Sequence, residues 1–168
     1  AVTGEKFERF DVAFVGAGFI GLEAAGALRA RGLEVHVIAP EAVPMERVLG
    51  PDLGGFIAGL HRAQGVVFHL GASVKAFDGD TVVLADGSRV PAQVVVVGVG
   101  VSPRTGLAAA AGIAVDDGIV VDACLRTSVP GIHAAGDVAL YPWGGERIRV
   151  EHWVHAQRQG QLAAQNML

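Results

Sequence analysis

Residues 11–21 read DVAFVGAGFIG, a short apolar run that ends in the glycine turn GAGFIG. Beyond the turn, apolar residues recur at helical spacing from Phe19 to Ala30, and Gly32 follows as a helix stop. A glycine pattern of this kind carries information when a strand precedes it and a helix follows it. The stretch therefore predicts a strand, a tight turn and a helix, which together open a βαβ unit.

Alternating segments continue this pattern along the chain. A strand is predicted at residues 34–38, a helix at 52–64 and a strand at 66–70, and the alternation implies parallel strands with right-handed crossovers. Two Asp-Gly hairpin signals lie within residues 72–90, which we expect to form a small antiparallel meander. The run AQVVVV at residues 92–97 is almost wholly apolar, which predicts a central parallel strand buried on both faces.

The organisation changes after about Thr105. An alanine-rich helix is predicted at residues 106–111, followed by a hairpin around residues 117–118. A loop then leads to a last helix at residues 151–167. The apolar face of this last helix is expected to consist of Trp153, Ala156, Gly160, Ala163 and Met167.

The segment TSVPGIHAAGDVA, residues 127–139, is interpreted as a turn, a short buried strand at residues 132–135, and the pair Gly136-Asp137 at the strand end. A small residue followed by one carboxylate lets a polar ligand approach the backbone and form hydrogen bonds there. The pair is therefore a candidate binding site of its own.

Composition bounds the class of protein. The chain has 168 residues, of which 51% are hydrophobic, enough for one domain or for one and a fraction. A net charge of −4 offers no basic footprint for nucleic acid or for an anionic membrane. No apolar run approaches the ~20 residues that cross a bilayer, and no leader is visible, so a cytoplasmic protein is expected. Cys124 is the single cysteine, which excludes a cysteine pair within this chain, and the histidines form no convincing metal site.

The three glycines of the turn have separate expected tasks. Gly16 permits the tight turn, Gly18 lets backbone N–H groups approach a pyrophosphate, and Gly21 allows close packing of helix on strand. The helix N-terminus offers unpaired donors and partial positive charge to phosphate groups. The alternative is a turn that only tightens this packing. The strand before it and the helix after it favour dinucleotide binding.

Ribose recognition is predicted about 20 residues further along the chain. Ala39, near the usual position of the acid, has no polar group, but Glu41 follows shortly after and either reaches the 2′-hydroxyl or is a solvent-facing loop residue. A carboxylate there favours NADH, because it would repel the 2′-phosphate of NADPH, whereas Arg47 is the nearby cation that argues for NADPH. Glu23, in the first turns of the helix, is explained equally well by the helix macrodipole and by a function.

Four blocks along the chain carry a resemblance to a known family. They read GAGFIGLEAA, VVVVGVGVSP, LRTSVPGIHAAGDVA and RVEHWVHAQRQGQLAAQNM, in this order. Together they resemble the ferredoxin reductase and apoptosis-inducing-factor-like members of the FAD-dependent pyridine nucleotide-disulfide oxidoreductase superfamily. The resemblance implies an NAD-binding domain at residues 11–104 and the returning segment of an FAD-binding domain at residues 105–168. The fold expected is α/β, with a Rossmann-like parallel sheet, an antiparallel β-meander and a partial second segment.

The resemblance also implies roles for single residues. Those implied to hold NADH are Gly16, Gly18 and Gly21 at the pyrophosphate, Phe19 and Ile20 along the turn, Glu23 toward the nicotinamide end, and Gly98 and Gly100 where the dinucleotide crosses the strand end. Gly136 and Asp137 belong to the second FAD signature, with Asp137 at the ribityl chain or pyrophosphate. Glu151, His152 and Trp153 begin a helix whose N-terminus faces the flavin ring, unless Trp153 is an ordinary core residue.

The implied function is that of a fragment of a flavin-dependent NADH oxidoreductase. Hydride passes from NADH to FAD, and the flavin then gives electrons to a carrier such as a ferredoxin or a rubredoxin. An FAD-binding glycine turn and a C-terminal domain are expected in the complete protein, outside these residues. Three alternatives stay open: a dinucleotide-binding module without turnover, a disulfide- or nitrite-reductase-type member of the superfamily, and a glycine turn at Gly16 that holds FAD itself.

Overall fold

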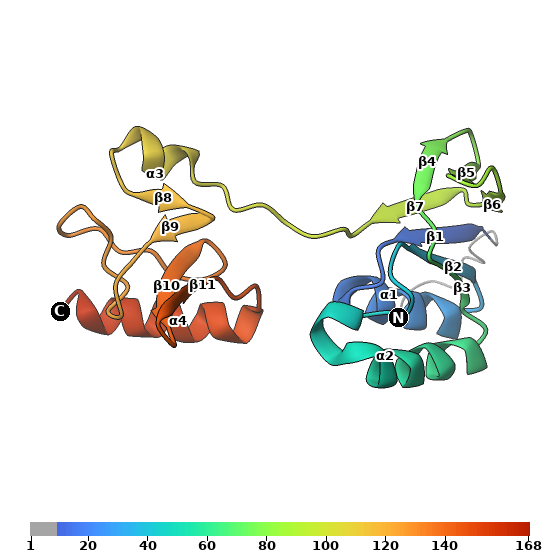
Figure 1. Ribbon diagram of the computed structural model, residues 1–168, viewed down its shortest axis with the longest axis horizontal. Coiled ribbons are helices and arrows are strands. Elements are labelled where there is room, and N and C mark those ends of the chain that lie inside the picture. The colour runs from blue at the N-terminus through green and yellow to red at the C-terminus, as the bar shows by residue number, and fades with distance from the viewer. Residues whose placement is uncertain (1–9) are drawn as a thin grey trace, which may run out of the picture. The chain divides into compact units, whose positions relative to one another are not determined.

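The computed structural model describes residues 10–168, which form two compact units that divide between Gly100 and Val101. Figure 1 shows the N-terminal unit in blue to green and the C-terminal unit in yellow to red. Each unit has its own sheet and its own buried core. The α/β fold class, with parallel and antiparallel sheets, is confirmed.

The N-terminal unit is built on a four-stranded parallel sheet in the order β3-β2-β1-β7. Residues of β1 and β2 alternate between two buried clusters, so these two strands are covered on both faces. Val12 and Val35 face a cluster that includes Ala25 of the first helix, whereas Ala13 and Ile38 face the opposite cluster. The elements are β1 (Asp11–Val15), α1 (Phe19–Ala30), β2 (Glu34–Ala39), α2 (Glu46–Ala63), β3 (Val67–Leu70) and β7 (Val94–Val97).

The second helix begins earlier than predicted. The sequence predicts a helix at residues 52–64, whereas α2 begins at Glu46 and contains a break at Gly50, where φ is +76°. The side chain of Glu46 accepts a hydrogen bond from the amide of Ala42, so this backbone N–H of the loop before the helix has a partner. Pro51 follows the break directly, at a position where a helix tolerates the missing N–H of proline. The prediction therefore found the longer part of the helix and missed its first turn.

The predicted antiparallel meander is present between β3 and β7. It consists of β4 (Val74–Phe77), β5 (Thr81–Leu84) and β6 (Arg89–Pro91), hydrogen-bonded in the order β4-β5-β6. Val82, Leu84 and Val90 of the meander are buried in one cluster with Ala13 and Ile38 of the parallel sheet. The meander thus covers the face of the sheet opposite α1.

The prediction for residues 92–97 is wrong in one respect. Strand β7 is parallel, but it lies at the edge of the sheet and pairs with β1 alone among the described strands. Its side chains are largely exposed, with Val97 at 58%. The all-apolar run therefore predicted the strand itself but neither its burial nor its position in the sheet, because both depend on pairing and packing partners from distant parts of the chain. The strands buried on both faces are β1 and β2.

The C-terminal unit has a smaller mixed sheet in the order β11-β10-β9-β8. Strands β9 and β10 are parallel, and the two outer pairs are antiparallel. The elements are α3 (Gly106–Ala110), β8 (Val115–Asp116), β9 (Gly118–Val120), β10 (Ala139–Trp143), β11 (Glu146–Ile148) and α4 (Trp153–Asn166). Its buried cluster consists of Val121, Leu125, Ala134, Ala139 and Ala163.

Two predictions in this unit are wrong. Residues 132–135 form no strand, and within them only His133 makes an isolated bridge, to Arg126. The turn that precedes them brings the amide of Ala134 to the carbonyl of Leu125, so this segment folds back locally and does not join a sheet. The predicted apolar face of α4 is also wrong at Trp153 and Met167, which are 75% and 61% exposed, and at the exposed Gly160; of the five predicted residues Ala163 is the buried one.

Candidate functional site

The glycine turn lies where the strand order of the parallel sheet reverses. From β1 the chain passes through α1 to β2 on one side, while β7 pairs with the other side of β1. The amide of Gly16 donates to Ile38 at 2.8 Å, and the amide of Gly98 donates to Val15 at 2.8 Å, so the ends of three strands are joined there. Open parallel sheets bind ligands in the crevice outside such a reversal point.

The three glycines of the turn are in different surroundings. Gly16 has φ of +111°, and a Cβ there would overlap the carbonyl of Gly98. A Cβ at Gly21 would lie 2.7 Å from the carbonyl oxygen of Gly16. Nothing lies within 4 Å of a Cβ built at Gly18, which is the N-cap of α1 and has no side-chain cap. The first and third glycines thus allow backbone contact, and the second leaves open space beside a helix N-terminus.

Such a space suits a phosphate. The first N–H groups of α1 have no partner within the helix, and they carry the positive end of its dipole. Phe19 and Ile20, the first residues of α1, are exposed, as is Val99 beyond β7. Gly100, with φ of +112°, continues the chain past this strand end, and no atom lies within 4 Å of a Cβ built at Gly98 or at Gly100. These features fit the pyrophosphate and the neighbouring parts of a dinucleotide.

Glu23 is exposed in the second turn of α1, and the first turn contains no acidic residue. Because the effect of the helix dipole falls off within the first turn, the dipole explains Glu23 poorly. Its role toward a ligand stays a prediction.

The loop after β2 is held against the glycine turn. The amide of Met45 donates to the carbonyl of Ala17 at 3.1 Å. Within this loop and the start of α2, Glu41 Oε1 lies 3.6 Å from Arg47 Nη2. Glu41, which favours NADH, and Arg47, which favours NADPH, are therefore paired with each other. Ala39 is fully buried and has no polar group to offer.

In the C-terminal unit, Gly136 lies against α4. Its φ is +82°, and a Cβ there would be 3.2 Å from the Cβ of Ala156. The amide of Gly136 donates to Gln159 Oε1 at 2.8 Å, and Gln159 is only 6% exposed. The next residue, Asp137, is exposed. The Gly136-Asp137 pair predicted to bind a ligand is thus anchored by the buried side chain of Gln159, which the sequence pattern does not single out.

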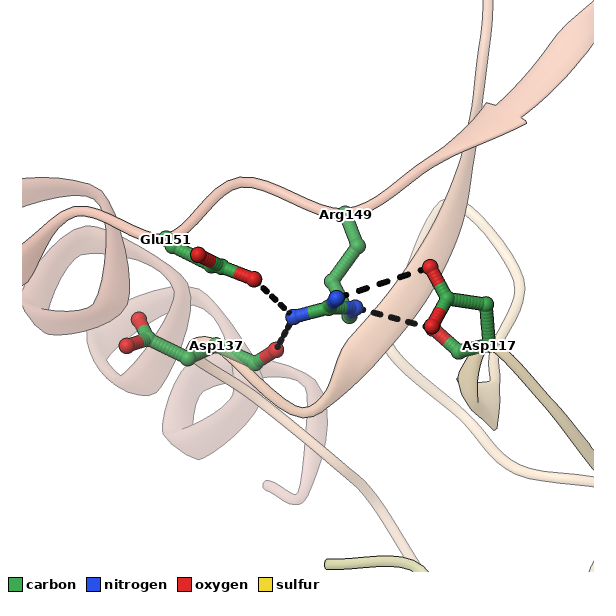
Figure 2. A network of polar contacts seen from close by, with 4 residues as sticks. All are labelled: Asp117, Asp137, Arg149 and Glu151. Atoms are coloured by element: carbon green, nitrogen blue, oxygen red, sulfur yellow. Dashed lines mark hydrogen bonds and ion pairs between the residues drawn. The ribbon is translucent and has the colours of Figure 1, made fainter. Parts of the chain in front are cut away.

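Arg149 joins Asp137 to two other segments. Figure 2 shows its guanidinium between Asp117, Asp137 and Glu151, with the Asp137 carboxylate pointing away from it. It donates from Nε to the Asp117 carbonyl at 2.9 Å, and from Nη1 to the Asp137 carbonyl at 3.2 Å and to Glu151 Oε1 at 2.6 Å. Partial burial opposes the charged form of Arg149, but the hydrogen bond to Glu151 and the charges of Asp117 and Glu151 outweigh it and raise the pKa of the guanidinium.

The N-terminus of α4 is capped by a histidine. His152 Nδ1 accepts a hydrogen bond from the amide of Val154 at 3.2 Å. The imidazole is stacked on Trp153, with 6.5 Å between the ring centroids. Three of the predicted residues, Glu151, His152 and Trp153, therefore share one exposed helix end. An exposed aromatic ring beside free helix N–H groups suits a flat, electron-rich ligand.

Gln159 and Arg149 were missed because neither residue type identifies its role. Both lie in the block RVEHWVHAQRQGQ, and Gln159 occupies a helical position between the small residues Ala156 and Ala163. A polar residue at such a position, expected to face the core, was the available signal. For Arg149, whose partners are up to 32 residues away, the sequence offers no comparable signal.

A separate apolar hollow of about 520 Å³ lies on the C-terminal unit. It is lined by α3, β9 and neighbouring loops, and no residue predicted to bind a cofactor lines it. The residues around it are Arg104, Leu107, Ala108, Ala111, Ile113, Ile119, Ile132 and Val138.

Histidines form one close pair in the N-terminal unit. His36 Nδ1 and His69 Nε2, on adjacent strands, are 3.1 Å apart. Burial lowers the pKa of His36 against the opposing charges of Asp11 and Glu34. Burial and the neighbouring His36 lower the pKa of His69, and the negative charge of Asp86 partly offsets this lowering.

Among residues 10–168, no group of three or more metal-ligating side chains is assembled. Over the same residues, no helix combines the length and the apolar character that crossing a membrane requires.

Comparison with known proteins agrees with this geometry. Residues 4–160 match the family described as pyridine nucleotide-disulphide oxidoreductase. The ferredoxin–NAD(+) reductase component of the anthranilate 1,2-dioxygenase system of Burkholderia cepacia is 43% identical over 163 residues, which cover 94% of this chain and 40% of that protein. Human apoptosis-inducing factor 3 is 37% identical over 168 residues, covering 94% of this chain and 28% of that protein.

Solved structures give the same result. The ferredoxin reductase for the CYP199A2 system of Rhodopseudomonas palustris is similar with a TM-score of 0.88 and 41% identity, covering 95% of this chain and 42% of that one. The reductase–putidaredoxin covalent complex is similar with a TM-score of 0.90 and 33% identity, covering 94% of this chain and 40% of that chain. The chain spans about 40% of the length of these two structures and of the Burkholderia reductase. It belongs to the pyridine nucleotide-disulphide oxidoreductase family and, within that family, is ferredoxin-reductase-like.

Proposed function

We propose that this chain is part of a flavin-dependent NADH oxidoreductase that reduces FAD with NADH and passes electrons to a small carrier such as a ferredoxin or a rubredoxin. Residues 11–104 are the NAD-binding domain in this proposal, and residues 105–168 are a segment of the FAD-binding domain. A cytoplasmic location, the compartment expected from the sequence, is part of the proposal. The names of the relatives, which include a ferredoxin–NAD(+) reductase component and a putidaredoxin reductase, support the proposed electron transfer.

The observation that carries the NAD assignment is the open space at Gly18. It lies beside the N-terminus of α1 at the strand-reversal point, with exposed Phe19 and Ile20 next to it. Backbone N–H groups hold the pyrophosphate there, Gly16 and Gly21 keep the turn close to the sheet, and Gly98 and Gly100 leave the strand end free of side chains.

In the FAD segment, Asp137 contacts the ribityl chain or the pyrophosphate of the cofactor. Its carboxylate is exposed, while the peptide groups beside it are bound to Gln159 and Arg149. The N-terminus of α4, with Glu151, His152 and Trp153, faces the flavin ring and stabilises negative charge on it through the helix dipole. When both cofactors are bound, the nicotinamide supplies the hydride and the flavin supplies an acceptor that can release electrons singly.

We propose NADH in preference to NADPH. Glu41, in the loop held against the glycine turn, accepts from the 2′-hydroxyl of the adenosine ribose and repels a 2′-phosphate. Its contact with Arg47 supports this, because a cation paired with Glu41 is not free for a phosphate.

The test uses the full-length protein that contains this chain. The purified protein should be yellow, and anaerobic addition of NADH should bleach its flavin absorbance. Electron transfer to a ferredoxin or a rubredoxin should then follow in a reduction assay. A full-length protein that binds no flavin, or whose flavin is not bleached by NADH, would contradict the proposal.

The isolated chain of 168 residues separates the alternatives. Calorimetry that detects NADH but no FAD is expected here, and the same result for the full-length protein would indicate a binding module without turnover. Yellow protein from the isolated chain would indicate that the turn at Gly16 holds FAD. If the full-length protein reduces a disulfide or nitrite and transfers no electrons to a carrier, it would be a disulfide- or nitrite-reductase-type member of the superfamily.

A further inference from the structure

One guanidinium connects three segments that are distant along the chain. Arg149 reaches Asp117 in the β8–β9 turn, 32 residues away, and Asp137 after the Gly136 bend, 12 residues away. It also reaches Glu151, directly before α4. Two of these three partners, Asp137 and Glu151, are among the residues proposed to face FAD (Figure 2).

The arginine of this network is far more buried than its carboxylate partners. The side chain of Arg149 is 11% exposed, whereas that of Asp117 is 72% exposed. Gly118 makes room for it, because a Cβ at this residue would lie 3.2 Å from Cδ of Arg149 and 2.8 Å from the carbonyl of Val138. The arginine therefore occupies a niche shaped by a glycine. Exposed ion pairs contribute little to holding segments in place, whereas a nearly buried guanidinium with several acceptors contributes more.

The contact with Asp137 goes through the main chain. Arg149 Nη1 donates to the Asp137 carbonyl, and the carboxylate of Asp137 points away from the guanidinium (Figure 2). One residue earlier, the amide of Gly136 donates to the buried Gln159. The Gly136-Asp137 segment is thus fixed at its first N–H and at its last C=O, and the carboxylate between them is left for a ligand.

We propose that Arg149 is a positioning residue for the FAD site: it fixes the Asp137 main chain and Glu151 relative to each other, so that the Asp137 carboxylate is held ready to accept hydrogen bonds from the ribityl hydroxyl groups of the cofactor. This inference rests on the proposed function, because it requires that the segment binds FAD. Arg149 itself touches no part of the cofactor in this proposal.

Lysine is a poor substitute at this position. The guanidinium presents N–H groups in a rigid planar fork, and here Nε and Nη1 point to different segments. An ammonium group keeps the charge but offers a single donor atom. Charge alone would therefore preserve the contact with Glu151 and lose the simultaneous contacts with two carbonyl groups.

The experiment compares Arg149→Met and Arg149→Lys with Arg147→Met in the full-length protein. Arg147 is the matched control, since it lies two residues away on β11, is exposed, and donates to the Val121 carbonyl, which belongs to no candidate site. FAD is removed, and its dissociation constant is measured by titrating the apoprotein. We expect at least tenfold weaker FAD binding for Arg149→Met, a several-fold loss for Arg149→Lys, and a change below twofold for Arg147→Met. NADH binding should change less than twofold in all three.

A double-mutant cycle separates positioning from general stabilisation. If Arg149 acts through Asp137, Arg149→Met should cost far less FAD affinity in an Asp137→Asn background than in the wild type. A merely structural arginine would give additive losses, and this result would overturn the proposal. Unchanged FAD binding in Arg149→Met, or full rescue by Arg149→Lys, would also overturn it. Should Arg149→Met fail to fold, the lysine variant and its cycle with Asp137→Asn decide alone. A wild-type protein that binds no FAD contradicts instead the proposed function.

Discussion

In the N-terminal unit the candidate site is made of backbone, whereas in the C-terminal unit the equivalent segment is held by side chains. Gly16 lies against the carbonyl of Gly98, and Gly18 leaves space for a ligand without any side-chain contact. The Gly136-Asp137 segment instead depends on Gln159 and Arg149. A backbone site is as stable as the sheet that carries it, but a side-chain network can be lost one hydrogen bond at a time.

The strongest way to break this comparison is Gly16→Ala. The new Cβ would overlap the Gly98 carbonyl, and alanine would have to adopt φ of +111°. Backbone strain and overpacking together should lower the free energy of unfolding of the N-terminal unit by about 3 kcal/mol or more. Chemical denaturation followed by circular dichroism measures this loss.

Gly18→Ala is the matched control for Gly16→Ala. It has open space and φ of −84°, so stability should change by about 1 kcal/mol or less. NADH binding should nevertheless weaken at least about tenfold, or about 1.4 kcal/mol, because the Cβ occupies the approach to the helix N-terminus. Equal stability losses in the two variants would mean that the turn is not shaped by contact with Gly98, the residue after β7.

The counterpart in the C-terminal unit is Gln159→Leu. Removing the acceptor leaves the amide of Gly136 buried without a partner, which should cost about 2 kcal/mol. Both tryptophans of the sequence, Trp143 and Trp153, lie in this unit, so tryptophan fluorescence during urea unfolding reports on it selectively. Gln157→Leu, at an exposed position of the same helix, should change stability by less than about 0.5 kcal/mol. Similar losses for the two variants would contradict an anchoring role for Gln159.

A smaller effect is expected at the Glu41–Arg47 pair. Glu41→Gln removes the repulsion of a 2′-phosphate and frees Arg47, so NADPH should bind about fivefold more tightly, since exposed charge pairs contribute up to about 1 kcal/mol. Titration by nucleotide fluorescence gives the affinities for NADH and NADPH. Arg47→Gln retains the carboxylate and should not improve NADPH binding. An improvement in this control, or none in Glu41→Gln, would assign the cofactor preference to other residues.

The smallest expected effect is a pH dependence of the stability of the N-terminal unit. Burial lowers the pKa of His36, of His69 and of His61 below the unfolded value of 6.5. Below pH 6.5 the unfolded chain therefore binds more protons than the folded chain. The stability that the neutral histidines allow is present above pH 6.5 and is lost as the pH falls through the folded pKa values. Urea unfolding at pH 7.5 and pH 5, at ~0.1 M salt, should show this loss.

The double variant His36→Gln, His69→Gln should flatten that pH slope and leave the part that belongs to His61. A slope equal to that of the wild type would show that the paired histidines do not contribute. Tryptophan fluorescence provides an internal reference, because it follows the unfolding of the C-terminal unit, which does not contain the His36–His69 pair.

Local patterns predicted much of the fold. The strand, turn and helix at residues 11–30 and the meander were found because hydrophobic spacing and turn residues are local signals. The lateral position of β7 was missed, because pairing partners come from distant parts of the chain. The first turn of α2 was missed because Gly50 and Pro51 interrupt it.

The candidate sites divide in the same way. The steric roles of Gly16 and Gly21 were predictable, because a Cβ at either residue would meet backbone atoms, whereas the role of Gly18 toward a pyrophosphate stays a prediction. Arg149 and Gln159 act through hydrogen bonds to backbone groups 12 and 23 residues away, which no spacing rule describes. The ligand contacts of all these residues stay predictions until a cofactor is titrated.

The exposed valines of β7 have a practical consequence. The strand pairs with β1 on one side, and among the described residues no strand pairs with its other side. Its sequence, VVVV, has high β-propensity and no charge, and such an unprotected edge is a template for pairing with another copy. Self-association of the isolated chain at high concentration would therefore begin at this edge, and a lysine introduced at Val97 is a simple way to suppress it.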